Sequence, residues 1–184
     1  MPATFPGYKA PTDLVIDAGV LYYGNSDATL ATAFGTTRDG FTFDTGMQTR
    51  DVPFDGGHSP FEGLSRITAW EATLKGKFLT VTGANMILFN PGSTSDGSSG
   101  NNVITMKKAG NLFQSADYIS HLWLIGRQQV DGTLVRVHFP LAYVGPLQIV
   151  TKHNDEWLID VTIKAVLPTG SDPQACPFFY DFAS

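Results

Sequence analysis

Two stretches in the first half of the chain, residues 41–50 and 66–81, alternate between apolar and polar side chains. Successive side chains of a β-strand point to opposite faces, so each stretch would have one face to bury and one for solvent. The apolar face of the first would carry Phe41, Phe43, Thr45, Met47 and Thr49, opposite Thr42, Asp44, Gln48 and Arg50. The apolar face of the second would carry Trp70, Ala72, Leu74 and Phe78, opposite Glu71, Thr73, Lys75 and Lys77. Because the stretches bracket residues 51–65, we predict a long β-hairpin with a large, glycine-bearing loop at its tip.

The second half of the chain is more regular. Residues 118–129 are apolar on both faces, and the Asp-Gly pair in 130–133 is typical of a tight hairpin turn. The run after this turn alternates between Val135, Val137, Phe139, Leu141, Tyr143 and the intervening Arg136, His138 and Pro140. The run 156–166 alternates between Trp157, Ile159, Val161, Ile163 and the facing Glu156, Asp160, Thr162 and Lys164. The pattern therefore predicts three further strands.

Shorter segments complete the secondary structure. Residues 14–24 mix β-branched and aromatic side chains and end at a glycine, which predicts a strand. Residues 83–89 predict a short helix that stops at Asn90, because the residue before a proline disfavours helix. The Gly/Ser/Asn-rich segment 92–102 predicts a loop.

We expect the whole of 1–184 to form one domain of mainly β class, a β-sandwich or barrel of roughly six to eight strands with one short flanking helix. Three prolines in 1–13 predict an extended N-terminal arm. The C-terminal arm, 171–184, contains four aromatic residues. A terminal segment as apolar as this should dock on something.

Charged residues are scarce. They make up 16% of the 184 residues, below the usual quarter, whereas 42% are apolar, so much of the surface can be hidden against partners. The formal net charge of −5 argues against a nucleic-acid reader, which normally presents a basic surface. The single Cys176 cannot form an internal disulfide, so we expect maturation in a reducing cytoplasm. We expect neither a signal peptide nor a membrane span.

Residues with catalytic or metal-binding chemistry form no recognisable motif. His58 and Glu62 have helical spacing, but Pro60 between them argues against a helix interior. His121 and His138 flank the tight turn as near neighbours, and a cross-strand polar pair is favoured there over a two-histidine metal edge. No G-x-S-x-G nucleophile motif occurs. We predict that the protein is not an enzyme and binds no metal or cofactor.

The hairpin region nevertheless resembles a known family. The sequence GTTRDGFTFDTG, then the FDGG loop, FEGLSRI and a strand ending KGKFL, resembles the major tail tube proteins of long-tailed (siphovirus) bacteriophages. The matching residues are Gly35, Thr37, Arg38, Gly40, Phe54, Asp55, Gly56, Gly63 and Leu64. Asp39 departs from the pattern, since a second glycine is common there, and the 92–102 loop is longer than usual. The resemblance is strongest over 35–79.

This resemblance implies a tail-tube-type β-sandwich whose copies form hexameric rings that stack into a tube, the conduit for DNA delivery into the host. It implies a virion protein assembled in the host cytoplasm, with other copies of the chain, a tape measure protein and tail-end proteins as partners. Phage DNA would pass through without specific binding. Closing sheets across subunits would also remove exposed strand edges. Three alternatives stay open: another tail or head–tail joining component of the same fold, the tube of a contractile injection system, and a small-molecule-binding β-barrel.

In the family, the loop that corresponds to 51–65 reaches a neighbouring subunit or ring; the alternative is an ordinary solvent-exposed loop. The expected subunit and ring interface comprises Phe54, Asp55, Gly56, Gly57, Phe61, Gly63, Leu64, Phe178, Phe179 and Tyr180. A conduit for a polyanion should not bind phosphate, which makes Asp44, Glu71 and Asp160 candidates for the tube lumen. Lys75, Lys77 and Lys164 share the same faces, so the charge balance there stays open.

Overall fold

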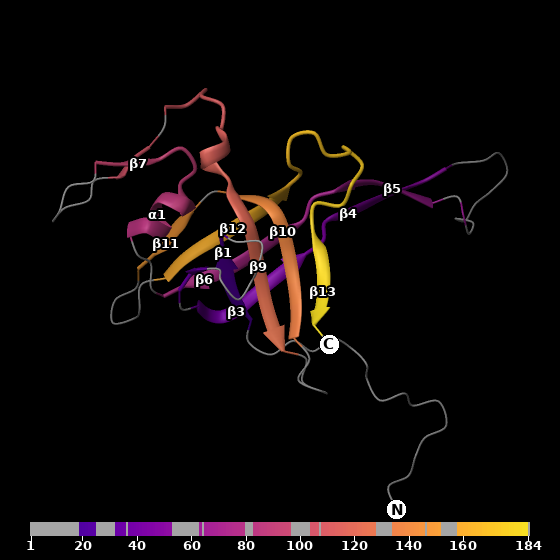
Figure 1. The fold of residues 1–184 in the computed structure, drawn as a ribbon, viewed down its shortest axis with the longest axis horizontal. Helices are drawn as coiled ribbons and strands as arrows, with labels where there is room; N and C mark the ends of the chain where they lie inside the picture. Colours follow the sequence, from indigo (N-terminus) through magenta and orange to yellow (C-terminus); the bar gives the residue numbers. More distant parts are fainter. Residues whose placement is uncertain are drawn as a thin grey trace, which may run out of the picture.

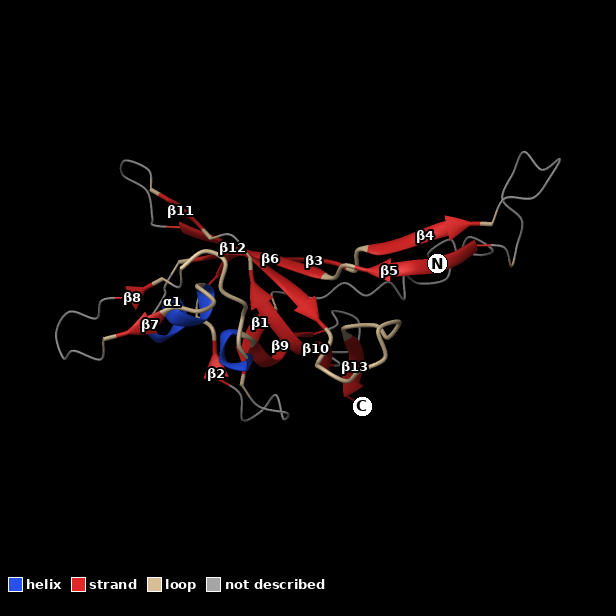
Figure 2. Cartoon of the chain, turned by 90° about the horizontal axis from the view of Figure 1, so that it is seen from above, coloured by secondary structure: helices blue, strands red, loops and turns tan. Residues whose placement is uncertain are grey.

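The computed structural model describes residues 19–24, 32–35, 37–52, 63, 65–79, 83–96, 104–106, 108–127, 134–145, 147–151 and 158–183. This part of the chain is mostly antiparallel β-structure with one short α-helix (Figures 1 and 2). The strands before the helix are β1 (Val20–Tyr23), β2 (Thr32–Ala33), β3 (Thr37–Asp44), β4 (Met47–Asp51), β5 (Ser65–Trp70) and β6 (Thr73–Phe78). Helix α1 (Gly83–Phe89) is followed by β7 (Thr94–Ser95), β8 (Ile104–Thr105), the 3₁₀ turn η2 (Ser115–Asp117), β9 (Ile119–Arg127), β10 (Leu134–Val144), β11 (Gln148–Val150), β12 (Leu158–Val166) and β13 (Phe179–Ala183).

One large sheet contains most of the described strands. Its order is β2, β1, β9, β10, β12, β6 and β3, with β11 paired to β12 and β13 paired to β10. The pairs β4–β5 and β7–β8 form separate two-stranded ribbons. Over the described strands, the sheet does not close into a barrel.

The sheet divides along β10. The first half of this strand, 134–138, pairs with β13, and its last part, 141–144, pairs with β12. The opposite edge of β10 is occupied by β9 over both halves, so β13 and β12 share one edge in turn. Pro140 lies at the division and has no N–H to offer to a ladder. β10 is therefore shared by two parts of the sheet, which we call its wings. One wing continues from β10 through β9, β1 and β2, and the other through β12, β6 and β3.

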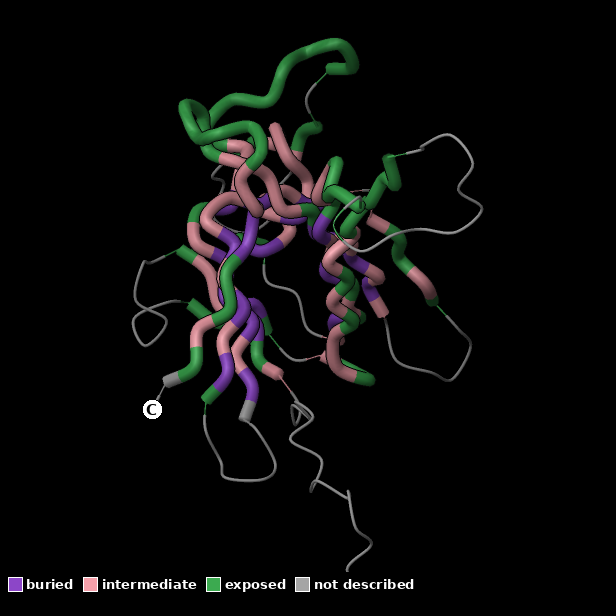
Figure 3. Tube along the Cα trace, turned by 90° about the vertical axis from the view of Figure 1, so that its right-hand side faces the viewer, coloured by how far each residue is buried: buried purple, intermediate pink, exposed green. Residues whose placement is uncertain are grey.

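The wings enclose a common hydrophobic core, which makes the fold a sandwich. Phe34 follows β2 in one wing, Phe78 ends β6 in the other, and Phe89 ends α1; none is more than 1% exposed. The Phe34 ring centroid lies 6.0 Å from that of Phe78 and 5.5 Å from that of Phe89. Figure 3 shows that the buried positions are concentrated on the strands of both wings, whereas the outlying segments are exposed.

Helix α1 covers one end of this core and confirms the helix predicted over 83–89. Besides Phe89, its buried residue Asn85 donates a hydrogen bond to the backbone carbonyl of Phe34. The helix stops where expected, and the side-chain amide of Asn90 donates to the Met86 carbonyl at 2.8 Å. None of the described helices is long and apolar enough to cross a membrane.

The predicted hairpin and final strand are confirmed. β3 pairs with β6 and β4 pairs with β5, and the tip between β4 and β5 corresponds to the expected loop. In β12 the alternating residues Ile159, Val161 and Ile163 are all buried; Trp157 lies outside the described residues, as does the N-terminal arm 1–13. The segment 92–102, predicted as a loop, contains β7, and its residues 97–102 lie outside the described part.

The prediction for the face of β10 was wrong beyond residue 139. Val135, Val137 and Phe139 are buried as predicted, but Ala142 and Val144 then take the core positions expected for Leu141 and Tyr143. The ladder is interrupted between the pairs Phe139–Leu122 and Leu141–Ser120, where Pro140 stands opposite His121. His121 has a left-handed backbone, with φ of 51°. The pairing register is the same on both sides of this irregularity, yet the buried positions shift by one residue on both strands, from Leu122 to Ile119 and from Phe139 to Ala142.

Candidate assembly surfaces

A two-stranded ribbon, β4–β5, projects from the end of the sandwich (Figure 2). The sequence predicted that Met47 and Thr49 continue the buried face of β3, and this was wrong: every residue of β4 is exposed. The reason is that β4 leaves the large sheet and, among the described strands, pairs with β5 alone. Met47 and Ile67 are each 50% exposed. The ribbon thus presents apolar side chains without a covering layer from the described residues.

Gly46 is the pivot from which the ribbon leaves the sheet. Its backbone is left-handed, with φ of 56°, and a Cβ there would overlap the carbonyl oxygen of Glu71, which lies between β5 and β6. The Glu71 N–H donates to the Gly46 carbonyl at 3.1 Å, and the Gly46 N–H donates to Asp44 Oδ1 at 2.9 Å. Gln48 Nε2 also donates to Glu71 Oε1 at 2.9 Å. Only glycine fits this close approach without displacing one strand.

The ribbon tip carries most of the sequence-predicted interface. Phe54, Asp55, Gly56, Gly57, Phe61 and Leu64 lie outside the described residues. Gly63 is described: it is exposed and has φ of 84°. At the base of the tip, the Ser65 hydroxyl donates to Asp51 Oδ1 and ties the ends of β4 and β5 together. The proposed contact role of the tip therefore remains a proposal.

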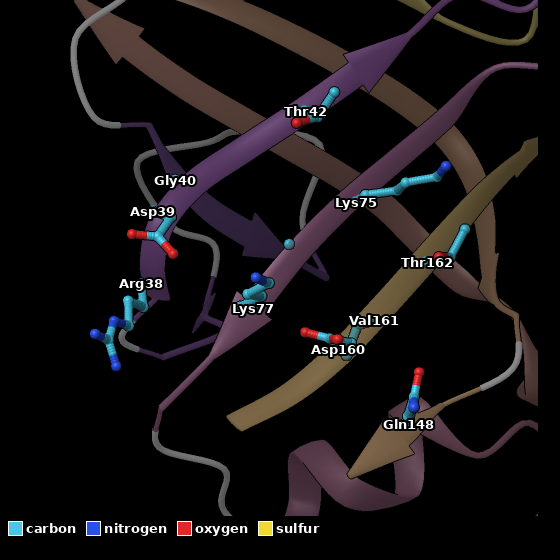
Figure 4. Close-up of a pocket in the computed structure, with 11 residues that line it drawn as sticks. Arg38, Asp39, Gly40, Thr42, Lys75, Lys77, Gln148, Asp160, Val161 and Thr162 are labelled. Carbon is cyan, nitrogen blue, oxygen red and sulfur yellow. The ribbon is translucent and has the colours of Figure 1, made fainter. Parts of the chain in front are cut away.

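A polar face covers β3, β6, β12 and β11 on the side away from the core. Register places Arg38, Lys77, Asp160 and Gln148 in one cross-strand row. The next rows contain Thr42, Lys75 and Thr162, and then Asp44, Thr73 and Lys164. The first row and its neighbours line an open depression of about 470 Å³ (Figure 4).

The polar face brings together two of the three lumen candidates. Asp44 and Asp160 lie on it, whereas Glu71 lies at the pivot of the ribbon. These three rows hold four cationic and two anionic side chains, a surplus of two positive charges. The Oδ1 atom of Asp160 is buried and has no hydrogen-bond partner among the described residues. The face as a whole is therefore not acidic.

The aromatic C-terminal segment docks on its own chain, as β13 along β10. Phe178 is 5% exposed, and its ring centroid lies 5.1 Å from that of Phe43 and 5.8 Å from that of Trp70. Among the expected interface residues, Phe178 thus belongs to the core, whereas Phe179 and Tyr180 are 55% and 48% exposed. The surface that β13 offers to a partner consists of the latter two and Phe182, which is 55% exposed.

The two histidines that flank the turn meet at the division of the sheet. His121 Nδ1 and His138 Nε2 are 3.0 Å apart, and the ring planes differ by only 13° with centroids 5.2 Å apart. The rings therefore meet edge to edge, as an N–H···N hydrogen bond requires. This confirms the cross-strand polar pair. The described residues contain no group of three potential metal ligands.

His138 is further held by aromatic and charged neighbours. Its ring stacks on Trp123 with centroids 3.8 Å apart and planes within 5°. Burial and the neighbouring His121 lower the pKa of His138 from 6.5 to about 4, against an opposing effect of Asp181. Asp181 of β13 pairs with Arg136 of β10, so the neutral imidazole lies beside a neutralised ion pair. The cluster joins β9, β10 and β13 on the face away from the core.

Sequence reasoning missed three features of these surfaces: the Gly46 pivot, the stacking of His138 on Trp123, and the pairing of Arg50 with Arg66 across the ribbon. Only the pivot had a signal in the sequence. Gly46 interrupts the alternating run 41–50 at the point where pairing with β6 gives way to pairing with β5. The other two depend on register between strands far apart in sequence.

No family model matches the sequence, and no curated protein matches it. Among solved structures, the chain is similar to one from the virion of a native gene transfer agent particle, with 10% identity and a TM-score of 0.44 over 90% of this chain and 95% of that one. It is also similar to a chain from the tail of an empty gene transfer agent particle, a structure with C6 symmetry, with 11% identity and a TM-score of 0.46 over 90% of this chain and 96% of that one.

Proposed function

We propose that the protein is a structural subunit of a phage-type tail, in which hexameric rings of the chain stack into a tube that conducts DNA. The sequence resemblance of 35–79 to siphovirus tail tube proteins supports this proposal. The subunit would assemble in the host cytoplasm and remain in the virion. A tape measure protein and tail-end proteins would be its other partners, and DNA would pass without specific binding.

The projecting β4–β5 ribbon is the observation that carries the proposal. An isolated two-stranded hairpin is marginally stable in water, and this one is exposed on both faces. Met47 and Ile67, each 50% exposed, contribute apolar surface that a monomer has no reason to display. A second copy that covers the ribbon would supply the missing layer. In the sequence, the expected interface loop connects β4 to β5, and its family counterparts reach neighbouring subunits or rings.

The edge formed by β13 supports self-association independently. Among the described strands β13 pairs only with β10, so its other edge is open. Phe179 and Phe182 add exposed aromatic surface there. Open, apolar edges favour pairing with other chains, and closed rings of identical subunits remove them.

The small-molecule-binding barrel is the weaker alternative. Ligand pockets are mostly concave and apolar, whereas the depression on the polar face is open and lined by Arg38, Lys75, Lys77, Asp39 and Asp160. The described strands also form an open sheet. A tail or head–tail joining component would use the same surfaces, and it differs from a tube protein in forming single rings.

Negative-stain electron microscopy of the purified protein tests the proposal. We expect six-fold rings and long tubes whose amount rises with concentration. A variant in which Ser replaces Met47 and Ile67 tests the role of the ribbon. Its circular dichroism spectrum should equal that of the wild type, which would show that the monomer is folded, but its tubes should be shorter or absent. Closed single rings would instead indicate a joining component. A strictly monomeric species by light scattering at high concentration would count against any self-assembling role.

We further propose that the polar face of β3, β6 and β12 faces the lumen, because the opposite face of these strands is committed to the core. Its carboxylates would moderate phosphate binding by the four cations on the same face. Asp160 is the carboxylate of this face that takes no part in the Gly46 pivot. Replacing Asp160 with Lys should therefore leave tubes intact but slow DNA ejection, most strongly at low salt, where the Debye length is longest. Unchanged ejection would show that this face does not line the channel.

A further inference from the structure

Two arginines face each other across the ribbon. Arg50 and Arg66 are directly paired in the β4–β5 register, and both are exposed. Like charges at such positions destabilise a strand pair. Neither side chain has a hydrogen bond or ion pair with any residue in the described part of the chain. The one carboxylate in β4 and β5, that of Asp51, accepts the hydrogen bond from Ser65.

One exposed carboxylate is also without a partner in the described ranges, and it belongs to Asp39. The other exposed acidic side chains of the described residues have partners: Asp44 with Gly46, Asp51 with Ser65, Glu71 with Gln48, and Asp172 with Gln174, and Asp96 also has an interaction of its own. Asp39 lies in a bulge of β3, with φ of 63°, where the register shifts between Arg38 and Phe41. Because β6 is the one partner of β3 among the described strands, this bulge is at the outer edge of the sheet that they form, as Figure 4 shows.

The arginine pair and Asp39 cannot meet within one copy. β4 continues away from β3 beyond Gly46, so Arg50 lies eleven positions further along an extended chain. At the rise of a β-strand, this separation is on the order of 30 Å. Any contact between these groups therefore requires two copies of the chain.

We propose that Arg50 and Arg66 of one copy bind the Asp39 carboxylate of a second copy, so that the ribbon lies against the outer edge of the neighbour's β3. The two oxygens of one carboxylate can accept hydrogen bonds from both guanidinium groups. A carboxylate placed between the two guanidinium groups offsets the repulsion between these paired positive charges. The inference rests on the proposed self-assembly and specifies one charged contact within it. A phosphate partner fits less well, because the chain carries a net charge of −5 and the ribbon offers only these two cations among its described residues.

Charge reversal tests the contact. The variants are R66E, D39R and the double R66E/D39R, with K108E as the control, because Lys108 is also exposed and its reversal changes the net charge as R66E does. Sedimentation and electron microscopy give the concentration at which assembly begins. We expect each single reversal to raise it by about tenfold or more, as buried interfacial charge pairs do, and the double variant to restore most of the loss. K108E should behave as wild type. The R66E effect should diminish at high salt.

Thiol cross-linking provides a second measurement if a reversed variant does not fold. Copies with Arg66→Cys and copies with Asp39→Cys, both in a Cys176→Ser background, should be joined into a dimer by a short bismaleimide, because an arginine–carboxylate contact separates the two backbones by more than a direct disulfide can span. The contact would be overturned if either single variant began to assemble at the same concentration as K108E, if the double variant showed no rescue, or if no cross-link formed. In each case, tubes formed by the wild-type protein would leave the proposed function standing. DNA binding that R66E abolishes would assign the arginines to phosphate instead. A wild-type protein that never assembles would remove both proposals.

Discussion

Replacing Gly46 with Ala measures how strongly the pivot fixes the ribbon. A left-handed backbone costs a non-glycine residue about 1–2 kcal/mol, and the reduced freedom of the unfolded chain returns about 0.4–1 kcal/mol. The new Cβ would also overlap the Glu71 carbonyl and displace the hydrogen bond from Glu71 N–H to Gly46, worth about 0.5–1.5 kcal/mol. The total is a loss of about 2 kcal/mol in the free energy of unfolding.

Gly40→Ala is the matched control. Gly40 also has a left-handed backbone, with φ of 72°, but a Cβ there meets nothing within 4 Å. This variant should lose about 1 kcal/mol, from the backbone cost alone. The pivot adjoins Ala72, which is 1% exposed and accepts a hydrogen bond from Ala165 N–H, so its disturbance should reach the cooperative unit. At a urea m-value of about 2 kcal/mol/M, the two midpoints should differ by roughly 0.5 M. Equal midpoints would refute the reasoning that close approach at Gly46 fixes the ribbon.

Three further predictions concern the core, the histidine pair and the β13 edge. Phe89→Ala should lower the free energy of unfolding by about 3–5 kcal/mol in urea titration, because Phe89 is fully buried against Phe34; a loss under about 1 kcal/mol would contradict this packing. The folded pKa of His138, about 4, lies below its ordinary 6.5, so the folded state binds fewer protons than the unfolded state between these values. The contribution of His138 to the free energy of unfolding should therefore be fully present above pH 6.5 and fall as the pH drops towards 4. His138→Gln should make the free energy of unfolding depend less on pH in this range. An equally steep pH dependence in the variant would exclude His138 as its source. Replacing Phe179 and Phe182 with Ser should leave the urea midpoint of the monomer almost unchanged but reduce assembly seen by light scattering, and normal assembly would show that this edge is not a contact.

The sequence predicts the strands whose two faces meet different environments. In β6 and β12 one face is in the core and the other carries Lys75, Lys77 and Asp160, so alternation alone identifies them. Alternation wrongly predicts a buried Met47, because the side chains of β4 continue to alternate after the chain has left the large sheet. It fails beyond Phe139 because Pro140 and the left-handed His121 shift the alternation, and no local pattern signals a shift that depends on two strands at once.

The candidate surfaces are less predictable for the same reason. Strand face alone places Asp44 and Asp160 together with three lysines, but only the register adds Arg38 to the row of Lys77 and Asp160. The opposition of Arg50 and Arg66 depends on a register shift between Gln48 and Thr49, which no spacing in the sequence indicates. Charged contacts between distant strands thus require the pairing itself to be known.

The division of the sheet along β10 has a consequence for synthesis on the ribosome. β12 leaves the ribosome before β13, so the last part of β10 can acquire its partner while the edge beside Val135 and Val137 is still open. These two side chains are at most 2% exposed in the finished fold, which makes the waiting edge both apolar and able to pair. A nascent chain that stalls before Phe179 would therefore expose an unpaired, apolar strand edge, which could pair with other nascent chains translated from the same messenger RNA. Rapid completion of the C-terminal strand would protect the chain against such misassembly.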